Sequence, residues 1–474
     1  MIEILGTIYV LAVASLSLFG LLGLFTLWLY WRHRHDAFPS PTVSLDDLPP
    51  VTIQLPIYNE KFVVNRLIEA AASQQYPAGR LHIQVIDDST DDTTDIAAGI
   101  VAHYKRKGIH IDLLHRSHRD GYKAGALAAA LPQAEGEFVA IFDADFQPRP
   151  DFLQRTIPFF VGEPELGMIQ ARWGHLNAGE SALTAVQAIA LDKHFAMEQT
   201  VRHRANMYPK FNGAGGIWRR ACIEDAGGWQ DDTVCEDLDL STRAILKGWQ
   251  FRFLNEVTAP AELPTSMTAY KSQQARWAKG STQCLNKFGG DILHDRNHSL
   301  SARLYALASM SAYSTHLLLL IMLLVQIPLI AFRYQFPANL FLFSLIAIGQ
   351  PILFVLGQQV LYPDWLHRLR HFPTLLVVAI GLAPSNSRAI LQAVFNRDHV
   401  FVRTPKTGMS GTKRPYRLPF DWIVVMETGL ALYALAGAAL AIYLHNWGPL
   451  FFLLMCTAGF GYVAFLSLRD LWGA

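Results

Sequence analysis

The sequence is short of charge. Asp, Glu, Lys and Arg make up 17% of its 474 residues, whereas an average soluble domain has about 25%. The shortage is uneven, because residues 32–303 hold 62 of the 79 charged side chains and the remaining 202 residues hold only 17. A soluble-type region therefore lies between two membrane-type regions. This distribution excludes both a wholly soluble enzyme and a wholly embedded transporter.

The sequence also has few cysteines and almost no net charge. The cysteines have neither C-x-x-C spacing nor histidines at metal-ligand spacing, and they are Cys222, Cys235, Cys284 and Cys456. We expect reduced thiols rather than disulfides or structural zinc. The formal net charge of +1 gives no support to nucleic-acid binding, so we expect no nucleic-acid partner. The aromatic content of 12% argues against disorder.

The outer regions do contain long apolar runs. Residues 6–31 are long enough to cross a hydrocarbon core of about 30 Å. No basic residue precedes them, so we interpret them as a span rather than a secretory signal. Basic residues 32–35 follow, which places this end of the span in the cytoplasm. Further apolar runs predict spans at residues 304–332, 334–363, 420–443 and 449–468.

Residues 372–395 are a separate case. Their apolar part stops at Pro384, after about 13 residues, which is too short to cross a membrane. The loops on both sides are basic, and residues 397–417 carry six Lys or Arg and one acid. We therefore interpret residues 372–395 as a re-entrant or interfacial element beside five full spans. The alternative is a sixth span, which would put the basic loop outside.

The charged central region alternates short β-branched runs with segments of helical spacing. Strands are predicted at residues 51–57, 81–86, 109–114 and 137–142, and helices at residues 61–75, 93–106 and 124–131. This order predicts an α/β fold with a mostly parallel sheet and helices on both faces. In such a sheet, ligands bind at the carboxyl ends of the strands.

Acidic clusters follow two of these strands. Asp87 and Asp88 come directly after one strand, and Asp143 and Asp145 come after another. Two carboxylates near one point suit a hard cation such as Mg²⁺ or Mn²⁺ that is shared with substrate phosphates. A lone D-x-D is a weak signal, because turns are rich in aspartate. Two clusters at the same edge of one sheet favour the metal-dependent site.

Further residues that could take part in binding or catalysis lie elsewhere in this region. Glu236 and Asp237 open a predicted helix, where acids either cap the helix dipole or act as a general base. Gly213 lies in a glycine-rich stretch, which either forms a turn or lets the backbone approach a ligand. Lys123 lies at the start of a predicted helix, where it and the helix N–H groups can bind phosphate.

These motifs, in this order, resemble those of the membrane-embedded family 2 glycosyltransferases, the group that includes cellulose, mannan, chitin and hyaluronan synthases. L-P-I-Y-N-E at residues 55–60 and D-D-S at 87–89 are similar to the nucleotide-sugar entry motifs. D-A-D at 143–145 is similar to the metal-binding D-x-D, and E-D at 236–237 to the pair that holds the catalytic base. Q-Q-A-R-W at 273–277 is similar to the Q-x-x-R-W signature.

The resemblance implies a cytoplasmic α/β domain of the GT-A type, inserted between transmembrane helices. It also implies inverting transfer from a nucleotide diphospho-sugar, a UDP- or GDP-hexose. Asp237 would be the catalytic base with Glu236 beside it, and Asp143 and Asp145 would hold Mg²⁺ or Mn²⁺. The donor would be bound by Tyr58, Glu60, Asp87, Asp88, Lys123, Asp143, Gln273 and Arg276. The acceptor would be bound by Trp277, Asn212, Gly213 and His194.

A further match lies between the last apolar runs. F-V-R-T-P-K at residues 401–406 resembles the F-x-V-T-x-K gating loop of bacterial cellulose synthase, with Arg403 in place of valine. The resemblance implies that Thr404 and Lys406 reach the donor from a cytoplasmic loop. Cys235 stands where the family has threonine before the E-D pair, which leaves Asp237 in place.

We expect the chain to be divided into an N-terminal membrane helix, a glycosyltransferase domain, interface helices with the Q-x-x-R-W motif, and a second membrane region. The corresponding residues are 1–35, 50–265, 266–300 and 301–474. The last region includes the re-entrant element and the gating loop.

Shorter stretches at residues 170–173, 192–199 and 211–219 are similar to cellulose-synthase-like mannan and glucan synthases. The resemblance implies a processive enzyme that makes a β-1,4-glucan or mannan and moves this polysaccharide across the plasma (inner) membrane, among membrane lipids. The alternative is addition of one sugar to a lipid acceptor, of the ceramide or diacylglycerol glucosyltransferase type. A third interpretation is a transporter or scaffold with a degenerate domain, and the intact carboxylates argue against it.

Overall fold

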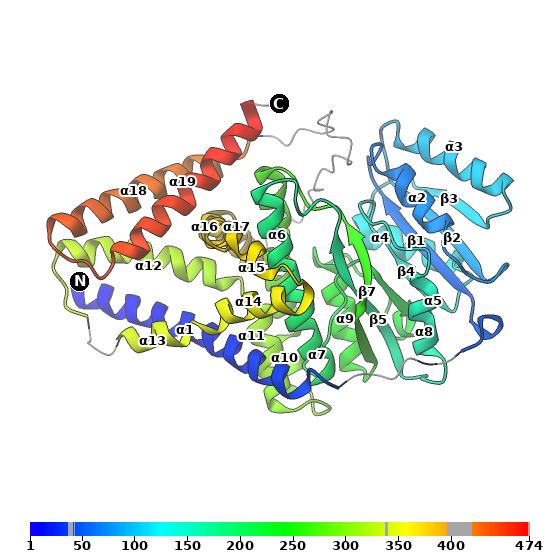
Figure 1. Cartoon of the computed structure of the whole chain (residues 1–474), viewed down its shortest axis with the longest axis horizontal. Helices are drawn as coiled ribbons and strands as arrows, with labels where there is room; N and C mark the ends of the chain where they lie inside the picture. The colour runs from blue at the N-terminus through cyan, green and yellow to red at the C-terminus, as the bar shows by residue number, and fades with distance from the viewer. Residues whose placement is uncertain (37–40, 42, 337–339, 396–419, 473–474) are drawn as a thin grey trace.

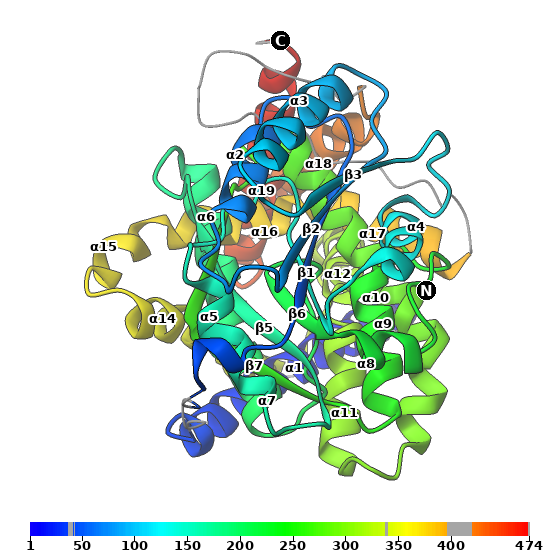
Figure 2. The same cartoon turned by 90° about the vertical axis from the view of Figure 1, so that its right-hand side faces the viewer.

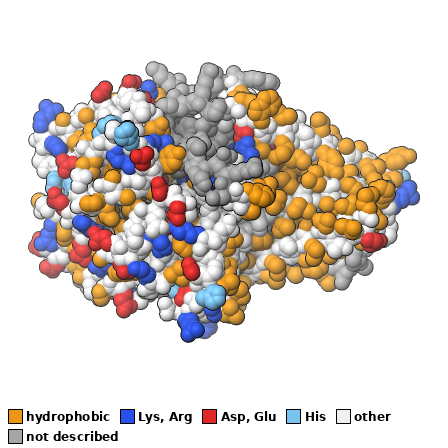
Figure 3. Space-filling model, turned by 180° about the vertical axis from the view of Figure 1, so that it is seen from behind, with side chains coloured by type: hydrophobic (Ala, Val, Ile, Leu, Met, Phe, Trp, Pro, Cys, Tyr) orange, Lys and Arg blue, Asp and Glu red, His pale blue; other side chains and the backbone are white. Residues whose placement is uncertain are grey.

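The computed structural model describes residues 1–36, 41, 43–336, 340–395 and 420–472. An α/β domain lies at one end of the molecule and a bundle of long helices at the other (Figure 1). Hydrophobic side chains cover the outside of the bundle, whereas charged side chains gather on the α/β domain (Figure 3). The two parts therefore correspond to the charge-poor and charge-rich stretches of the sequence.

One sheet forms the centre of the α/β domain. Its strands are β1 (Val51–Ile57), β2 (Leu81–Asp87), β3 (Ile111–His115), β4 (Phe138–Ile141), β5 (Leu166–His175), β6 (Gly216–Arg219) and β7 (Gln250–Ala261). They lie in the order β3-β2-β1-β4-β6-β5-β7. Neighbouring strands are parallel, except that β6 runs antiparallel to β4 and β5. The predicted fold class, a mostly parallel α/β sheet, is confirmed.

Alternate residues of the strands pack on opposite faces of the sheet, as the two-residue period of a strand requires. Val139 and Ile141 of β4 lie in one buried cluster with α4 (Tyr122–Ala130), α8 (Arg220–Asp225) and α9 (Glu236–Leu246). Phe138 and Ala140 lie in the other cluster, with α2 (Val64–Ala72), α3 (Thr93–Arg106) and α5 (Phe152–Thr156). Figure 2 shows α4, α8 and α9 on one side of the sheet and α5 on the other. Because both faces are covered, the strands are apolar along their length.

The order of the strands places a crevice at the centre of the sheet. From β1 the chain adds β2 and β3 outward on one side, and then returns to add β4 on the other side of β1. Such a reversal leaves an opening at the carboxyl ends of the strands, where ligands bind in sheets of this kind. The predicted polar clusters follow β1, β2 and β4, and therefore come together at this opening.

Among the described residues, four helices are long and apolar enough to cross a membrane: α1 (Ile2–His33), α12 (Ser314–Ala331), α18 (Ile423–Tyr443) and α19 (Leu450–Trp472). They identify the chain as a membrane protein. A pair of helical segments, Trp365–Gly381 and Ala383–Val394, is bent by 42° and counts as a fifth span if the pair crosses as a whole. The bend lies next to Pro384, where the apolar run stops. The re-entrant interpretation of residues 372–395 stays a prediction.

Residues 334–363 differ from the expected span. The structure has two helices there, α13 (Phe341–Ile346) and α14 (Gly349–Leu361), each too short to cross. Gly349 packs on α1 so closely that a Cβ atom would lie 2.6 Å from the backbone nitrogen of Leu24. On the domain side, Gln358 of α14 donates a hydrogen bond to the buried Asp192 at 3.0 Å. These contacts fix α14 between α1 and the α/β domain, and hydropathy does not record them.

Candidate active site

One cleft gathers most of the predicted site residues. It lies at the carboxyl ends of β1 and β4, and its wall includes the first turn of α9 and part of α10 (Met267–His294). The predicted residues that line it are Tyr58, Glu60, Asp88, Lys123, Asp143, Asp145, Asn212, Gly213, Glu236, Asp237, Gln273, Arg276 and Trp277. Motifs that are far apart in the sequence therefore meet in one place.

Lys123 is at the centre of the charge network of the cleft. Its Nζ lies 2.5 Å from Asp143 Oδ1 and 3.5 Å from Glu236 Oε1, and it donates a hydrogen bond to the Gly213 carbonyl at 2.9 Å. Burial by itself would lower the pKa of Lys123, but the Asp143 and Glu236 carboxylates outweigh burial and raise this pKa. The ammonium group therefore stays charged and joins the D-x-D, the glycine-rich turn and the acid pair.

Asp237 lies in the first turn of α9 and faces Gly213. Burial, followed by the charge of Glu236, raises the pKa of Asp237 to about 6. Its Oδ1 accepts a hydrogen bond from the backbone N–H of Leu238 at 2.8 Å. Gly213 has φ of +87°, and a Cβ atom there would lie 3.2 Å from Asp237 Oδ2. Glycine therefore lets the backbone come close to a carboxylate whose pKa suits proton transfer near neutral pH.

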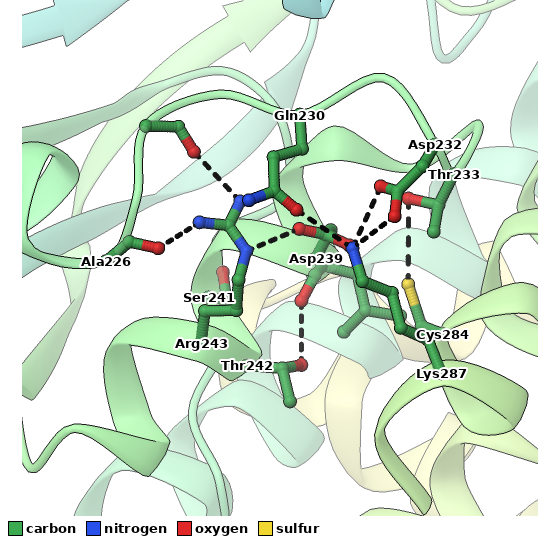
Figure 4. Close-up of polar contacts among 12 residues, drawn as sticks. Ala226, Gln230, Asp232, Thr233, Asp239, Ser241, Thr242, Arg243, Cys284 and Lys287 are labelled. Carbon is green, nitrogen blue, oxygen red and sulfur yellow. Dashed lines mark hydrogen bonds and ion pairs between the residues drawn. The ribbon is translucent and has the colours of Figure 1, made fainter.

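Asp239, the next acid of α9, does not line the cleft. It is fully buried, and its Oδ1 accepts a hydrogen bond from Arg243 Nε at 2.7 Å (Figure 4). Its Oδ2 lies 2.6 Å from Nζ of Lys287 on α10, and Lys287 also bonds Asp232 at 2.9 Å. This network joins α9 to α10 and fixes the helix that carries Asp237. The sequence resemblance assigns the catalytic pair to Glu236 and Asp237 and gives no role to Asp239.

The loop after β3 contributes two arginines that the sequence analysis did not single out. Arg119 lines the cleft and stacks on Tyr58, with its guanidinium carbon 3.5 Å from the ring centroid. Arg116 binds Asp88 through two hydrogen bonds, at 2.7 Å to Oδ1 and 2.5 Å to Oδ2. Their signal in the sequence is a basic stretch directly after a predicted strand. Asp88 is therefore held in place by a neighbouring cation.

The structure does not bring Asp87 to the cleft wall. Asp87 is fully buried, and its carboxylate accepts hydrogen bonds from the backbone N–H of Ser89 at 3.0 Å and from the Thr94 hydroxyl at 2.6 Å. It shapes the loop from which Asp88 reaches the cleft. Thr404 and Lys406, in the predicted gating loop, lie outside the described residues.

His194 also lies behind the cleft and not in its wall. Its Nε2 lies 2.9 Å from Nδ2 of Asn212, and its Nδ1 lies 2.9 Å from Oε2 of Glu198. Burial lowers the pKa of His194 to about 4, despite the Glu198 carboxylate, so the ring is neutral. A neutral imidazole fixes the orientation of Asn212, which does line the cleft.

Asp143 and Asp145 are the cleft residues that fit a divalent cation. Both line the cleft and follow one strand end, and carboxylate oxygens are the ligands that Mg²⁺ and Mn²⁺ prefer. Burial raises the pKa of Asp143, and the charge of Asp145 adds to this effect while Lys123 opposes it. The two carboxylates therefore repel each other, and Lys123 counters part of this effect on Asp143. A cation between the two carboxylates would relieve this repulsion.

A second group of potential metal ligands lies at the opposite edge of the sheet. The ligand atoms of His82, His110 and Asp112 lie within 4.8 Å of one another. These residues lie at the starts of β2 and β3, whereas the cleft is at the ends of the strands. His82 Nε2 lies 3.1 Å from Asp112 Oδ2, and Lys105 Nζ lies 2.7 Å from Asp112 Oδ1. This group does not serve the cleft.

The helix α10 connects the cleft to the helical bundle. It carries Trp277 and the other residues of the Q-x-x-R-W motif into the cleft wall. Gln274 of α10 accepts a hydrogen bond from the hydroxyl of Tyr313, which precedes α12, at 3.3 Å. Lys271 of α10 forms a buried ion pair with Glu427 of α18, at 2.9 Å. One wall of the cleft is therefore fixed to helices that are long enough to cross a membrane.

Comparisons with known proteins agree with this geometry. Residues 49–280 match the family described as glycosyltransferase like family 2. The chain is 40% identical over 283 residues to glucomannan 4-beta-mannosyltransferase 7 of Arabidopsis thaliana, a match that covers 59% of this chain and 50% of that protein. It is 40% identical over 282 residues to glucomannan 4-beta-mannosyltransferase 1 of Oryza sativa subsp. japonica, which covers 58% and 54%. The chain thus spans about half the length of the curated relatives it matches.

A solved structure shares the fold. It is the mannosyltransferase PcManGT from Pyrobaculum calidifontis in complex with GDP-Man and Mn²⁺, with a TM-score of 0.55 and 20% sequence identity. The match covers 83% of this chain and 100% of that chain. It confirms the expected GT-A type of α/β fold.

Proposed function

Residues 49–280 form a domain of glycosyltransferase family 2, and on this premise we propose that the chain transfers hexose units from a nucleotide diphospho-sugar to a β-1,4-linked polymer of the mannan type. The observation that carries the proposal is the position of Asp237, which lies in one cleft with Lys123 and the Asp143–Asp145 pair. The glucomannan mannosyltransferase relatives support mannose as the sugar, and GDP-mannose is then the expected donor.

The proposed reaction is a single displacement with inversion. The acceptor hydroxyl attacks the anomeric carbon of the donor, and its proton passes to the Asp237 carboxylate. The bond from the anomeric carbon to the diphosphate oxygen breaks, and the nucleoside diphosphate leaves with that electron pair. Burial and the Glu236 charge raise the pKa of Asp237 to about 6, which makes the carboxylate a better proton acceptor than an exposed aspartate.

Cationic groups of the cleft would bind the diphosphate. Lys123 and Arg276 supply positive charge, and the guanidinium fork of Arg276 suits phosphate oxygens. Asp143 and Asp145 would hold Mg²⁺ or Mn²⁺. The bound cation would offset the negative charge on the leaving group. The donor would also be contacted by Glu60, Asp88 and Gln273. Donor contacts by Thr404 and Lys406 are implied by the sequence resemblance alone.

The stacked Tyr58–Arg119 pair offers a flat, partly cationic surface beside these groups, which suits a nucleobase. The acceptor would lie on the other side of Asp237. Trp277 offers the flat apolar face on which a sugar ring stacks, and Asn212 with Gly213 lies beside the base. His194 acts through Asn212, since it does not reach the cleft.

We further propose that the enzyme is processive and passes its polymer across the plasma membrane, with the α/β domain on the cytoplasmic side. The arrangement of α10 supports this proposal, because the cleft wall continues into the bundle through the Gln274–Tyr313 hydrogen bond. The same proximity to the bundle favours the second candidate function, transfer of one sugar to a membrane lipid. Both functions use the same base and donor site and differ in the product.

Product analysis distinguishes the two. Purified protein in detergent is incubated with labelled GDP-mannose, and in parallel with UDP-glucose, GDP-glucose and UDP-N-acetylglucosamine. The proposal predicts nucleotide release with GDP-mannose and a polymer that β-mannanase digests. A lipid carrying one sugar would overturn processivity and leave the transferase assignment intact. Absence of turnover with every donor, in protein that remains folded, would overturn the assignment itself.

A further inference from the structure

Two histidines and an aspartate lie together on the outer strands, at the end of the sheet opposite the cleft. His82 is the second residue of β2, His110 directly precedes β3, and Asp112 is the second residue of β3. Because His110 and Asp112 are two residues apart, their side chains share one face of the chain. The N–H of Ile83 donates a hydrogen bond to the His110 carbonyl at 2.9 Å, which sets the two histidines side by side. Their rings are stacked, with centroids 4.4 Å apart.

The polar atoms of this group are spaced like the ligands of one metal ion. Asp112 Oδ2 lies 3.1 Å from His82 Nε2 and 4.0 Å from His110 Nε2. Glu135, in the loop before β4, brings its Oε1 to 3.6 Å from His110 Nε2. A tetrahedral zinc site with bonds of about 2.0–2.1 Å holds its ligand atoms about 3.3–3.4 Å apart. Small side-chain rotations would therefore bring these atoms to zinc distance.

The protonation states of this group also suit a metal. Burial lowers the pKa of His82, although the hydrogen bond with Asp112 opposes this effect, so the imidazole is neutral at neutral pH. The hydrogen bond from Lys105 lowers the pKa of Asp112, so its carboxylate is ionised. Neutral imidazole and ionised carboxylate are the forms that bind metals, and a proton on the ligating nitrogen passes to water when the metal binds.

Lys105 is the neighbouring cation with which a metal would compete. Its Nζ lies 2.7 Å from Asp112 Oδ1, whereas the oxygen that faces both histidines is Oδ2. The Lys105 side chain is 51% exposed, and ion pairs of such exposed groups are weak. A cation can therefore bind Oδ2 while Lys105 keeps Oδ1 or turns into water. The carboxylates of Asp112 and Glu135 outnumber this one ammonium group, so the group as a whole attracts a cation.

We propose that His82, His110 and Asp112, together with Glu135, bind one Zn²⁺ ion. Imidazole nitrogens and carboxylate oxygens at near-tetrahedral spacing are ligands typical of zinc. Because β3 is the edge strand of the sheet, the ion would join this edge to β2 and to the loop before β4. The site is structural, and it is independent of the sugar, the donor and the cation of the cleft.

Isothermal titration calorimetry of the full chain, purified without a histidine tag, tests the proposal. Zinc is titrated in excess Mg²⁺, which occupies oxygen-only sites such as the D-x-D and leaves imidazole sites open. The wild-type protein should bind one zinc ion with these ligands. His110→Ala and Asp112→Asn should weaken binding at least about tenfold, since even residues that only orient a metal ligand contribute about 10–100-fold. His103→Ala, which removes an exposed histidine of α3, is the matched control and should bind zinc like the wild type.

A second pair of variants should change the zinc affinity in the opposite direction. Lys105→Met removes the cation that competes for Asp112, so zinc should bind more tightly than to the wild type. Lys107→Met removes an exposed cation from the same end of α3 and should have a smaller effect. Equal zinc affinity in these two variants would mean that Asp112 is not a ligand, which overturns the proposal.

Three further results would also overturn it. The first is a wild-type protein that binds no zinc in excess Mg²⁺. The second is equal zinc affinity in His110→Ala and His103→Ala, because the binding is then not at this group. The third is loss of zinc binding in Asp143→Asn, because the zinc then lies in the cleft.

Discussion

The buried ion pair between Lys271 and Glu427 gives the sharpest stability prediction. Nζ of Lys271 on α10 lies 2.9 Å and 3.1 Å from the two carboxylate oxygens of Glu427 on α18. The side chains are 4% and 0% exposed. Removal of one partner leaves an uncompensated buried charge, which typically costs about 3–5 kcal/mol. Replacement of both by methionine removes both charges together and should cost about 1 kcal/mol or less, or even stabilise the protein.

A double-mutant cycle measures this directly. The free energy of unfolding is determined in detergent for Lys271→Met, Glu427→Met and the double variant. The exposed pair of Lys247 and Asp225, with side chains 50% and 48% exposed, is the control and should contribute far less than the buried pair. The reasoning is refuted if each single Lys271 or Glu427 variant costs less than about 1 kcal/mol, or if the double variant costs the sum of the two.

Three further predictions concern the first turn of α9. Because Asp237 must be ionised to accept a proton and its pKa is about 6, activity should be lost as the pH falls through about 6; a pH–rate profile that is flat down to pH 4 would contradict this. Gly213→Ala should reduce turnover at least tenfold, because alanine is strained at this positive φ and its Cβ atom would lie 3.2 Å from Asp237 Oδ2. Gly228→Ala at φ +71°, with no atom within 4 Å, is its control and should reduce stability alone, by about 1 kcal/mol. Asp239→Asn should weaken the contact with Lys287 and lower kcat more than it raises KM, and an unchanged kcat would exclude a role in positioning α9.

The sequence predicts the sheet and the motif-bearing loops well, because local patterns determine them. The expected strand at residues 51–57 and helix at 93–106 coincide with β1 and α3. In both segments, apolar spacing, turn residues and tertiary burial favour the same structure, so the local sequence pattern is sufficient to predict the element. The acids that follow β1, β2 and β4 converge for the same reason, since parallel strands end at one edge.

The remaining differences come from interactions between segments far apart in sequence. Asp87 and Asp88 are adjacent and identical. Asp87 accepts a hydrogen bond from Thr94 behind the cleft, whereas Asp88 is held at the cleft by Arg116. Asp239 lies two residues after Asp237 on the same helix and instead joins α9 to α10. Hydropathy predicted one span at residues 334–363, but the structure has α13 and α14 there, and Gly349 at the start of α14 packs against α1. No local pattern encodes these partners.

The rate of sugar transfer by Asp237→Asn tests the central claim most directly. The substitution keeps the size of the side chain and removes its capacity to accept a proton. With GDP-mannose as donor, transfer should fall about 10²–10⁴-fold, the usual contribution of a general base. Binding of GDP, measured by calorimetry, should stay within a few-fold of wild type because the donor site is intact. Transfer within tenfold of the wild-type rate would contradict the assignment of Asp237 as the base.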